Sequence, residues 1–321
     1  MQIIMRCVCC QLEDFTVQYS LRDLAFGAEG VWDFVCCSNC GHGCLSPIPS
    51  EEELVILYTN LYSKEKKEQM IKMGQGGFDQ SLQHRRARML KQAIGDQQVQ
   101  CIVDIGCGMG FSLEKLYNLW SDARCVGLEM SPIAAEEAQK ISGLEIHHES
   151  FQNASQKGLW NHGSIDIVTM NHVVEHLIDP KLDLQMVFEQ LKEGGLLLIE
   201  VPHLDGWGRN WMKKWWWGHL PPQHIHLFTL TGMKRLLEQI GFQIISEERH
   251  GYPLIFLFTW ALFLRGTIGG LSSFRTNRFI KIISILIGVV LSPLVITLDI
   301  VVTTIMNIKH GDLITIVAQK K

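Results

Sequence analysis

Four cysteines near the N-terminus form two C-x-x-C pairs, a spacing typical of metal sites: Cys7, Cys10, Cys37 and Cys40. A two-residue spacer turns both thiolates of a pair toward one point, so two pairs supply the four tetrahedral ligands that zinc prefers. Gly41 after the second pair permits a tight backbone turn. Cys9 and Cys36 adjoin the pairs, so the choice between neighbouring thiols stays open. We expect a structural Zn²⁺ here, with reduced buried thiols as the alternative.

The stretch "NHVVEHLIDP" contains His172, Glu175 and His176 in the spacing H-x-x-E-H. On a long helix this spacing can bind zinc for hydrolysis. Here Pro180 favours a helix that begins only after the motif, and an apolar strand pattern precedes it. We therefore expect these side chains at the rim of a pocket, where a histidine with a near-neutral pKa can act as a general base.

The run "VDIGCGMGF" places Gly106, Gly108 and Gly110 between an apolar strand and a helix. Backbone N–H groups at such a helix start favour a polar or negatively charged ligand. The pattern departs from a dinucleotide fingerprint, because the third glycine comes one residue early and Phe111 follows it. Asp104 precedes the loop, where its carboxylate would repel a pyrophosphate. The loop therefore suits a nucleotide-like ligand with a positive centre.

The next strand ends at Glu129, in "GLEMS", where an acid can accept hydrogen bonds from both hydroxyls of a ribose. Together with Asp104 and the three glycines, this acid resembles the pattern of class I S-adenosylmethionine-dependent methyltransferases. Their ligand carries a sulfonium cation, an ammonium and a ribose but no phosphate. The resemblance covers about residues 100–250 and the last few residues.

This resemblance implies where the cofactor would bind. Its methionine part would lie at Asp104 and the glycine loop, its ribose at Glu129, its adenine beside Ser150 and Phe151, and Asn171 would close the methionine side. The whole expected cofactor-binding set is Asp104, Gly106, Cys107, Gly108, Gly110, Glu129, Met130, Ser150, Phe151 and Asn171.

The N-terminal cysteines, the run "PSEEEL" and the run "PPQHIHLFT" resemble a subgroup in which a zinc ribbon precedes the methyltransferase domain. Methyl transfer is an in-line displacement, so the protein positions the nucleophile and removes the proton of a hydroxyl. His172 and His226 are the first choices for the base, with His176 and His224 on the same rim. For each of them a structural role is the alternative.

The region after the fourth strand of the core also resembles ubiquinone-biosynthesis O-methyltransferases, which place a Glu-x-x-Glu-His metal site there. Glu175 and His176 match that pattern, but His172 replaces its first acid. Because Mg²⁺ prefers oxygen ligands, this departure speaks against a catalytic Mg²⁺.

The elements that must position these residues follow from the pattern of apolar runs. After Gln100, short apolar runs alternate with helical patterns, which predicts a parallel sheet with helices on both faces and ligands at the carboxyl ends of its strands. "FQIISEE" and the terminal "LITIVAQ" are expected to pair as an antiparallel hairpin. The fold class is α/β: a Rossmann-like methyltransferase sheet with an antiparallel last strand, a small N-terminal zinc ribbon and an apolar helical C-terminal insertion.

The expected units are a zinc ribbon in residues 1–46, a helical connector in 47–99, a cofactor-binding core in 100–250, an apolar insertion in 251–311 and the last strand in 312–321. In the connector, Ser50 and Glu53 have the spacing of a capping box at a helix start.

Composition narrows the classes of function. The 321 residues are 47% hydrophobic and 19% charged, which predicts a globular chain rather than a disordered one. The net charge of −4 and the pI near 6.3 give no overall basic field, so a nucleic-acid partner is not favoured. The start "MQIIMRCVCC" lacks the pattern of a secretory signal, so we expect a reducing, cytoplasmic location.

The C-terminal third is aromatic and apolar. "GWGRNWMKKWWWGH" sets Trp beside Lys and Arg, which is typical of a membrane-interface segment or of an aromatic lid over a hydrophobic substrate. The runs 252–264 and 282–308 are strongly apolar, yet the strands on either side should pair in one sheet. We therefore expect a monotopic or re-entrant attachment to the cytoplasmic membrane face, with a packed helical cap as the alternative.

These observations predict S-adenosylmethionine-dependent methyl transfer, at oxygen, to a lipid-linked or otherwise hydrophobic acceptor at the membrane. Two alternatives stay open. One is an RNA methyltransferase that uses the ribbon to bind RNA, and the other is a non-catalytic membrane scaffold with a degenerate fold.

Overall fold

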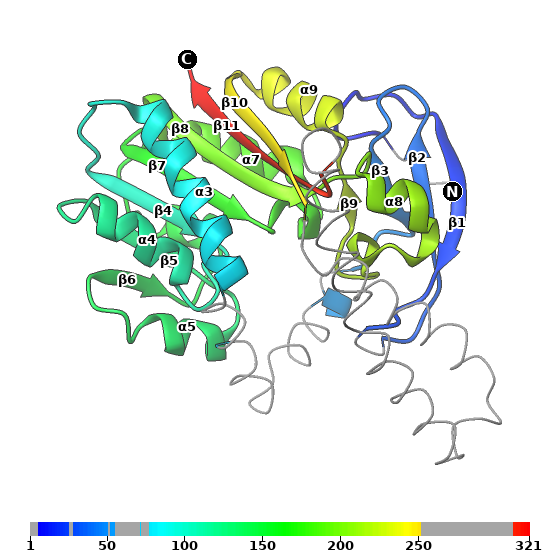
Figure 1. Ribbon diagram of the computed structural model, residues 1–321, viewed down its shortest axis with the longest axis horizontal. Helices are drawn as coiled ribbons and strands as arrows, with labels where there is room; N and C mark the ends of the chain where they lie inside the picture. The colour runs from blue at the N-terminus through cyan, green and yellow to red at the C-terminus, as the bar shows by residue number, and fades with distance from the viewer. Residues whose placement is uncertain (1–5, 26–27, 51, 55–70, 72–76, 252–310) are drawn as a thin grey trace, which may run out of the picture.

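The computed structural model describes residues 6–25, 28–50, 52–54, 71, 77–251 and 311–321. These residues form a large sheet flanked by helices, at the left of Figure 1, and a small sheet that begins at the N-terminus, at the right.

Seven strands make up the large sheet. In spatial order they are β10 (Phe242–His250), β11 (Leu313–Lys320), β8 (Leu191–Pro202), β7 (Ile165–Asn171), β4 (Cys101–Ile105), β5 (Arg124–Leu128) and β6 (Leu144–His147). Among these seven, β11 alone runs in the direction opposite to the other six. The predicted Rossmann-like sheet with an antiparallel last strand is confirmed.

Helices cover both faces of this sheet because its central strands are apolar on both sides. Ile102 packs on one face with Leu90, and Val103 packs on the other with Val187, as the alternation of side chains along a strand requires. The first face carries α3 (Gly77–Ile94), α4 (Phe111–Leu119) and α5 (Pro132–Ala138), and the second carries α6 (Phe151–Gln156), α7 (Pro180–Gln190) and α9 (Leu230–Ile240).

Side-chain caps begin four of these helices. The residues whose oxygens accept from a first-turn N–H are Ser131, Ser150, Asp179 and Thr229. Pro180 occupies the first turn of α7, as predicted, because its missing N–H is not needed there.

The helix that Pro180 begins, α7, is short. It ends at Gln190, and β8 begins at once with Leu191, which pairs with Ile165. A Cβ on Gly195 would lie 2.8 Å from the Lys192 carbonyl oxygen and 3.1 Å from that of Ile165. A side chain larger than that of glycine at position 195 would therefore collide with these backbone oxygens.

The hairpin of β10 and β11 brings together two distant parts of the chain. His250, at the end of β10, pairs with Leu313, at the start of β11. The ends of the apolar run 251–311 therefore lie side by side at the sheet. The apolar runs 252–264 and 282–308, and with them the predicted membrane attachment, lie outside the described residues. Within the described ranges no helix is both long and apolar enough to cross a membrane.

The small sheet joins the N-terminal part of the chain to a segment near residue 226. It pairs β1 (Phe15–Leu21), β2 (Trp32–Cys37), β3 (Gly43–Ser46) and β9 (His226–Leu227), all antiparallel. Because β9 comes from the core, the ribbon and the core share this sheet. The expected capping box is also present, since Ser50 Oγ accepts from the Glu53 N–H and Glu53 Oε2 accepts from the Ser50 N–H.

Candidate functional site

The glycine loop after β4 is held open by backbone geometry that only glycine adopts easily. Gly106, Gly108 and Gly110 have φ values of 68°, 56° and 83°. A Cβ on Gly106 would lie 2.6 Å from Val173 Cγ2, whereas a Cβ on Gly108 would meet no heavy atom within 4 Å. The loop therefore packs closely against the segment after β7 and leaves space beside Gly108.

Asp104, at the end of β4, has one carboxylate oxygen with hydrogen-bond donors and one without. Its side chain accepts hydrogen bonds at Oδ1 from Thr169 Oγ1 at 2.5 Å and from Asn171 Nδ2 at 3.5 Å. Oδ2 is buried without a partner. Burial raises the pKa of Asp104 to about 6, against the opposing hydrogen bond from Thr169. A buried unpaired carboxylate oxygen calls for a donor, and an ammonium group would supply one.

Glu129, at the end of β5, is anchored by backbone donors. Its Oε2 accepts from the Gly108 N–H at 2.8 Å and its Oε1 from the Ser131 N–H at 2.7 Å. Burial raises the pKa of Glu129. A carboxylate has about four acceptor positions, so each oxygen can still accept from a hydroxyl. The adjoining Met130 is 62% exposed and borders the same edge.

The remaining expected cofactor residues line the neighbouring loops. Ser150 caps α6, and the buried Phe151 stacks on Trp160 at 5.3 Å between ring centroids. Cys107 is buried in the glycine loop, and burial raises the pKa of its thiol. All ten predicted residues lie at or just after the carboxyl ends of β4 to β7. Their donors and acceptors fit S-adenosylmethionine, and their individual roles stay a prediction.

His172 follows β7 in a strained backbone conformation. Its φ is 54°, and its N–H donates to the Glu200 carbonyl at 2.8 Å. Its side chain is 31% exposed, with Nδ1 3.1 Å from Glu175 Oε1 and Nε2 3.6 Å from Glu200 Oε1. Burial lowers the pKa of His172, but the carboxylates of Glu175 and Glu200 outweigh it and raise the pKa above its usual value. Strain of this kind is commonly retained at functional sites.

Glu200 is a site residue that the sequence pattern does not predict. It is fully buried near the end of β8. Arg86 Nε of α3 donates to its Oε1 at 3.0 Å, and Thr315 Oγ1 of β11 donates to its Oε2 at 2.7 Å. His250 Nε2 lies 3.2 Å from the same carboxylate. The Arg86 guanidinium holds the pKa of Glu200 well below its usual range despite the opposing burial. The one sign of Glu200 in the sequence is that it is a single acidic residue within the apolar run "LLLIEVP".

Two other predicted rim histidines form a second group. His176 Nδ1 lies 2.9 Å from the Gln223 carbonyl oxygen, and His224 Nδ1 lies 2.7 Å from that of Gly218. Their ring centroids are 4.8 Å apart, and Glu175 Oε2 is buried without a hydrogen-bond partner. Glu175 thus lies with two imidazoles, a donor set that suits Mg²⁺ poorly.

His226, the other first choice for the base, lies in β9 at the junction of ribbon and core. It is buried, with Nδ1 3.1 Å from His42 Nε2 and Nε2 3.3 Å from the Ile178 carbonyl oxygen. Burial lowers the pKa of His226 to about 4 and that of His42 to about 3. Because both ring nitrogens of His226 have protein partners, this geometry favours the structural role.

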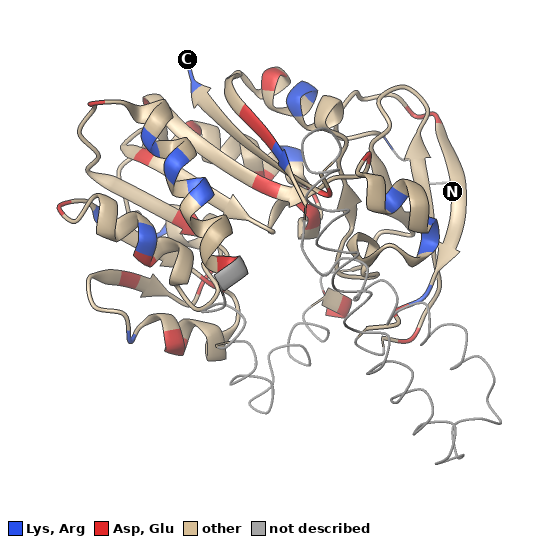
Figure 2. Cartoon of the chain, viewed as in Figure 1, with Lys and Arg blue, Asp and Glu red and all other residues tan. Residues whose placement is uncertain are grey.

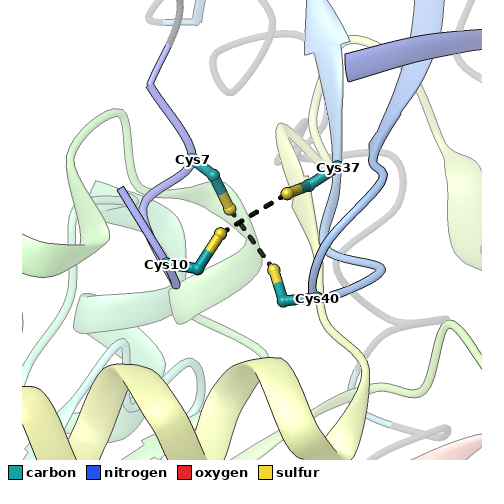
Figure 3. A group of neighbouring side chains, drawn as sticks. All are labelled: Cys7, Cys10, Cys37 and Cys40. Carbon is teal, nitrogen blue, oxygen red and sulfur yellow. Dashed lines mark hydrogen bonds between the residues drawn. The ribbon is translucent and has the colours of Figure 1, made fainter. Parts of the chain in front are cut away.

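The four predicted zinc ligands converge. Figure 3 shows Cys7 and Cys10 from the N-terminal loop pointing toward Cys37, the last residue of β2, and Cys40 in the turn that follows it. The Sγ atoms of Cys7 and Cys40 are 3.4 Å apart and those of Cys10 and Cys37 are 3.5 Å apart. All four lie within 4.8 Å of one another. This donor set fits one tetrahedral zinc ion.

A scan against protein-family models matches residues 77–247 to a methyltransferase domain. The chain belongs to this methyltransferase family. The matched range contains every element that carries the glycine loop, Glu129 and His172. Together with the sheet order, it identifies the fold as that of the class I S-adenosylmethionine-dependent methyltransferases.

Two curated relatives match this chain over short ranges. The ubiquinone biosynthesis O-methyltransferase of Colwellia psychrerythraea is 30% identical over 101 residues, which are 31% of this chain and 41% of that protein. The trans-aconitate 2-methyltransferase of Deinococcus radiodurans is 30% identical over 118 residues, 36% of this chain and 43% of that protein. The matches span less than half of these relatives.

Among solved structures, the plantazolicin methyltransferase BpumL in complex with SAH covers 82% of this chain and 92% of its own. It is 14% identical, with a TM-score of 0.50. At this identity the likeness extends to the fold alone.

The aromatic run 206–219 divides between core and surface. Trp216 is fully buried in the ribbon core with Phe34, whereas Trp211 of α8 (Trp207–Met212) is 68% exposed. Lys214 Nζ lies 5.0 Å from the centroid of the Trp215 ring. One aromatic and its basic neighbours are therefore available at the surface.

Proposed function

We propose that the chain transfers the methyl group of S-adenosylmethionine to an oxygen atom of a hydrophobic or lipid-linked acceptor. This proposal rests on two features that lie at the same edge of the large sheet. The first is the buried unpaired Oδ2 of Asp104, and the second is the strained His172 held between two carboxylates.

The cofactor supplies, when bound, an electrophilic methyl group on a sulfonium cation. Asp104 Oδ2 accepts from the ammonium group of the cofactor's methionine part, which satisfies its missing hydrogen bond. Glu129, pinned by the Gly108 and Ser131 N–H groups, accepts from the ribose hydroxyls. Phe151, stacked on Trp160, supplies an apolar wall beside the adenine.

His172 acts as the general base. Glu175 Oε1 accepts from the Nδ1–H, which fixes the tautomer and leaves Nε2 to take the proton of the acceptor hydroxyl. Once Nε2 is protonated, the imidazolium lies between the carboxylates of Glu175 and Glu200. These acids therefore stabilise the charge that develops on His172.

A hydrophobic acceptor is supported by the place where the apolar run joins the fold. His250, which precedes the run, lies 3.2 Å from Glu200, and Glu200 contacts His172. The run therefore leaves and re-enters the sheet beside the proposed base. The exposed Trp211 adds an aromatic group typical of membrane interfaces. We infer a peripheral or monotopic location on the cytoplasmic membrane face.

The name of one relative agrees with oxygen as the target. One is an O-methyltransferase of ubiquinone biosynthesis. RNA as acceptor has less support, because acidic residues are interspersed with basic ones over the described elements (Figure 2). RNA-binding surfaces usually concentrate Lys and Arg on one face.

The direct test is transfer of labelled methyl from S-adenosylmethionine into a membrane-lipid extract and, in parallel, into RNA. We expect label in the lipid fraction, and none there with the His172→Ala protein. Label in RNA alone would replace the acceptor that we propose. Cofactor binding without transfer to either fraction, unchanged by substitution of His172, would instead support a scaffold.

A further inference from the structure

The ribbon contains more metal-type donors than its two C-x-x-C pairs. Cys9 and His42 are buried beside Cys7, and the ligand atoms of these three residues lie within 4.8 Å of one another. Cys7 thus belongs both to the four-cysteine group and to this second group. The two groups form one continuous cluster of five thiols and one imidazole.

The spacing in the second group is that of ligands around one ion. Cys7 Sγ lies 3.6 Å from His42 Nδ1. Zinc bonds of about 2.3 Å to sulfur and about 2.0–2.1 Å to nitrogen, at a tetrahedral angle, place the two ligand atoms ~3.6 Å apart. The same geometry places two sulfurs ~3.8 Å apart, near the 3.4 Å between Cys7 and Cys40. These two pairs of ligand atoms are therefore already at the separation that a shared zinc ion requires.

The far side of His42 has the partners of a metal-bound imidazole. The Ile178 carbonyl can only accept, so His226 donates to it from Nε2 and keeps Nδ1 as an acceptor. His42 Nε2 must then donate to His226 Nδ1 at 3.1 Å. In its neutral form His42 therefore directs the lone pair of Nδ1 toward Cys7. Metal-ligating histidines have this arrangement, with the other ring N–H held by a second partner.

A simple hydrogen bond does not explain this contact once the first zinc ion is bound. Cys7 as a zinc ligand is a thiolate and has no proton to donate. Its sulfur and the lone pair of His42 Nδ1 would then face each other at 3.6 Å in a buried site. A cation between them removes the repulsion and satisfies both groups.

We propose that the ribbon binds a second divalent ion, zinc in the cell, through Cys7, Cys9 and His42, with the Cys7 thiolate bridging the two ions. Six donors thus serve two ions, and Cys7 is the donor that both groups share. The thiol protons are released to solvent as the ions bind.

This second ion joins the ribbon to the core. Gln239 Nε2 of α9 donates to the Cys9 carbonyl at 3.2 Å, and Thr229 Oγ1 donates to that of Cys40 at 3.0 Å. His226, which holds His42, also contacts Ile178 in the segment that follows the H-x-x-E-H motif. His226 is accordingly a positioning residue for the metal. This inference does not depend on methyl transfer.

The test is the zinc content per chain of the purified full-length protein, prepared under reducing conditions. We expect two zinc ions, and one fewer in both Cys9→Ser and His42→Ala. Cys36→Ser is the matched control, because this thiol adjoins Cys37 but belongs to neither group. His224→Ala controls for any zinc held by the imidazoles outside the ribbon. One zinc ion in the wild-type chain, or unchanged zinc in Cys9→Ser and His42→Ala, would overturn the proposal.

X-ray absorption at the zinc edge gives a second measurement that needs no variant. Two ions bridged by the Cys7 thiolate predict a metal–metal contribution and a nitrogen ligand, whereas one four-cysteine ion gives sulfur alone. A pure sulfur shell without a metal–metal contribution would contradict the second site. For His226→Ala we expect affinity for the second ion to fall by roughly 10- to 100-fold, with the first ion retained.

Discussion

His172 and His226, the two histidines that the sequence favours as the general base, lie in contrasting regions of the molecule. His172, at the carboxyl edge of the large sheet, is partly exposed and faces two carboxylates. His226, at the junction of ribbon and core, is buried and faces an imidazole and a carbonyl oxygen. A carboxylate stabilises the protonated ring, whereas a carbonyl partner and burial favour the neutral one. The groups that contact a histidine, more than the residue type, decide whether it can act as a base or has a structural role.

The largest effect that tests this contrast is on the rate of transfer. Loss of a general base lowers the rate by ~10²- to 10⁴-fold, so His172→Ala should lose that factor in kcat at saturating cofactor. His226→Ala should keep kcat within a few-fold and instead lower thermal stability. The measurement is methyl-label transfer alongside thermal unfolding. A His226→Ala protein that is stable but inactive would reverse the assignment.

The buried acid behind His172 offers a test of stability. Arg86→Ala leaves Glu200 fully buried without its guanidinium partner, and breaking such a pair costs about 3–5 kcal/mol. Arg88→Ala is the control on the same helix, because its pair with Glu248 is largely exposed and should be worth less than about 1 kcal/mol. Urea unfolding measures both. Equal losses would mean that Glu200 is not an uncompensated charge in the Arg86 variant.

Cofactor affinity tests the other acid of the sheet edge. Asp104→Asn keeps the shape of the side chain but removes the charge that would face an ammonium group. Hydrogen bonds to charged groups contribute about 1.5–3 kcal/mol, so the Kd for S-adenosylmethionine should rise by roughly 10- to 100-fold in calorimetry. Asp183→Asn, on α7, should leave the Kd unchanged. An unaltered Kd in Asp104→Asn would remove this residue from the cofactor site.

The smallest effect is on pH dependence. The base works when neutral, so the transfer rate should fall as the pH drops through the raised pKa of His172. Glu175→Gln removes the hydrogen-bonded carboxylate that raises this pKa, so the midpoint of the pH profile should move to lower pH. The measurement is kcat/KM against pH for both proteins. A midpoint that moves upward would show that Glu175 does not act on the base in this way.

Sequence reasoning reached the parts of the site that local spacing controls. The glycine loop, Asp104 and Glu129 each adjoin the end of their own strand, so the order of the strands is enough to bring them to one edge. The cysteine pairs converge for two reasons. Each two-residue spacer directs both thiols of a pair to one point, and the hairpin of β1 and β2 brings the two pairs together. The start of α7 at Pro180 was likewise a local signal.

Other features could not be predicted from the sequence, because the residues that they contact are remote in the chain. Glu200 meets Arg86 and Thr315 from elements more than a hundred residues away. The two residues of β9 have too little pattern to predict a strand, and only pairing with β3 makes them one. At the end of α7, Leu191 pairs with Ile165 of β7, which a helical pattern does not reveal.

By itself, the amino-acid sequence determined the alternation of strands and helices, the glycine loop with its acids and the four-cysteine set. All of these arise from residues only a few positions apart, whose geometry is limited by backbone sterics and side-chain reach. Only the tertiary structure decided which histidine faces carboxylates, which carboxylate is buried with an arginine, and that His42 joins the cysteine cluster. The protonation of a ring and the affinity of a thiol group for metal depend on neighbours within a few ångströms, and folding alone brings those neighbours together.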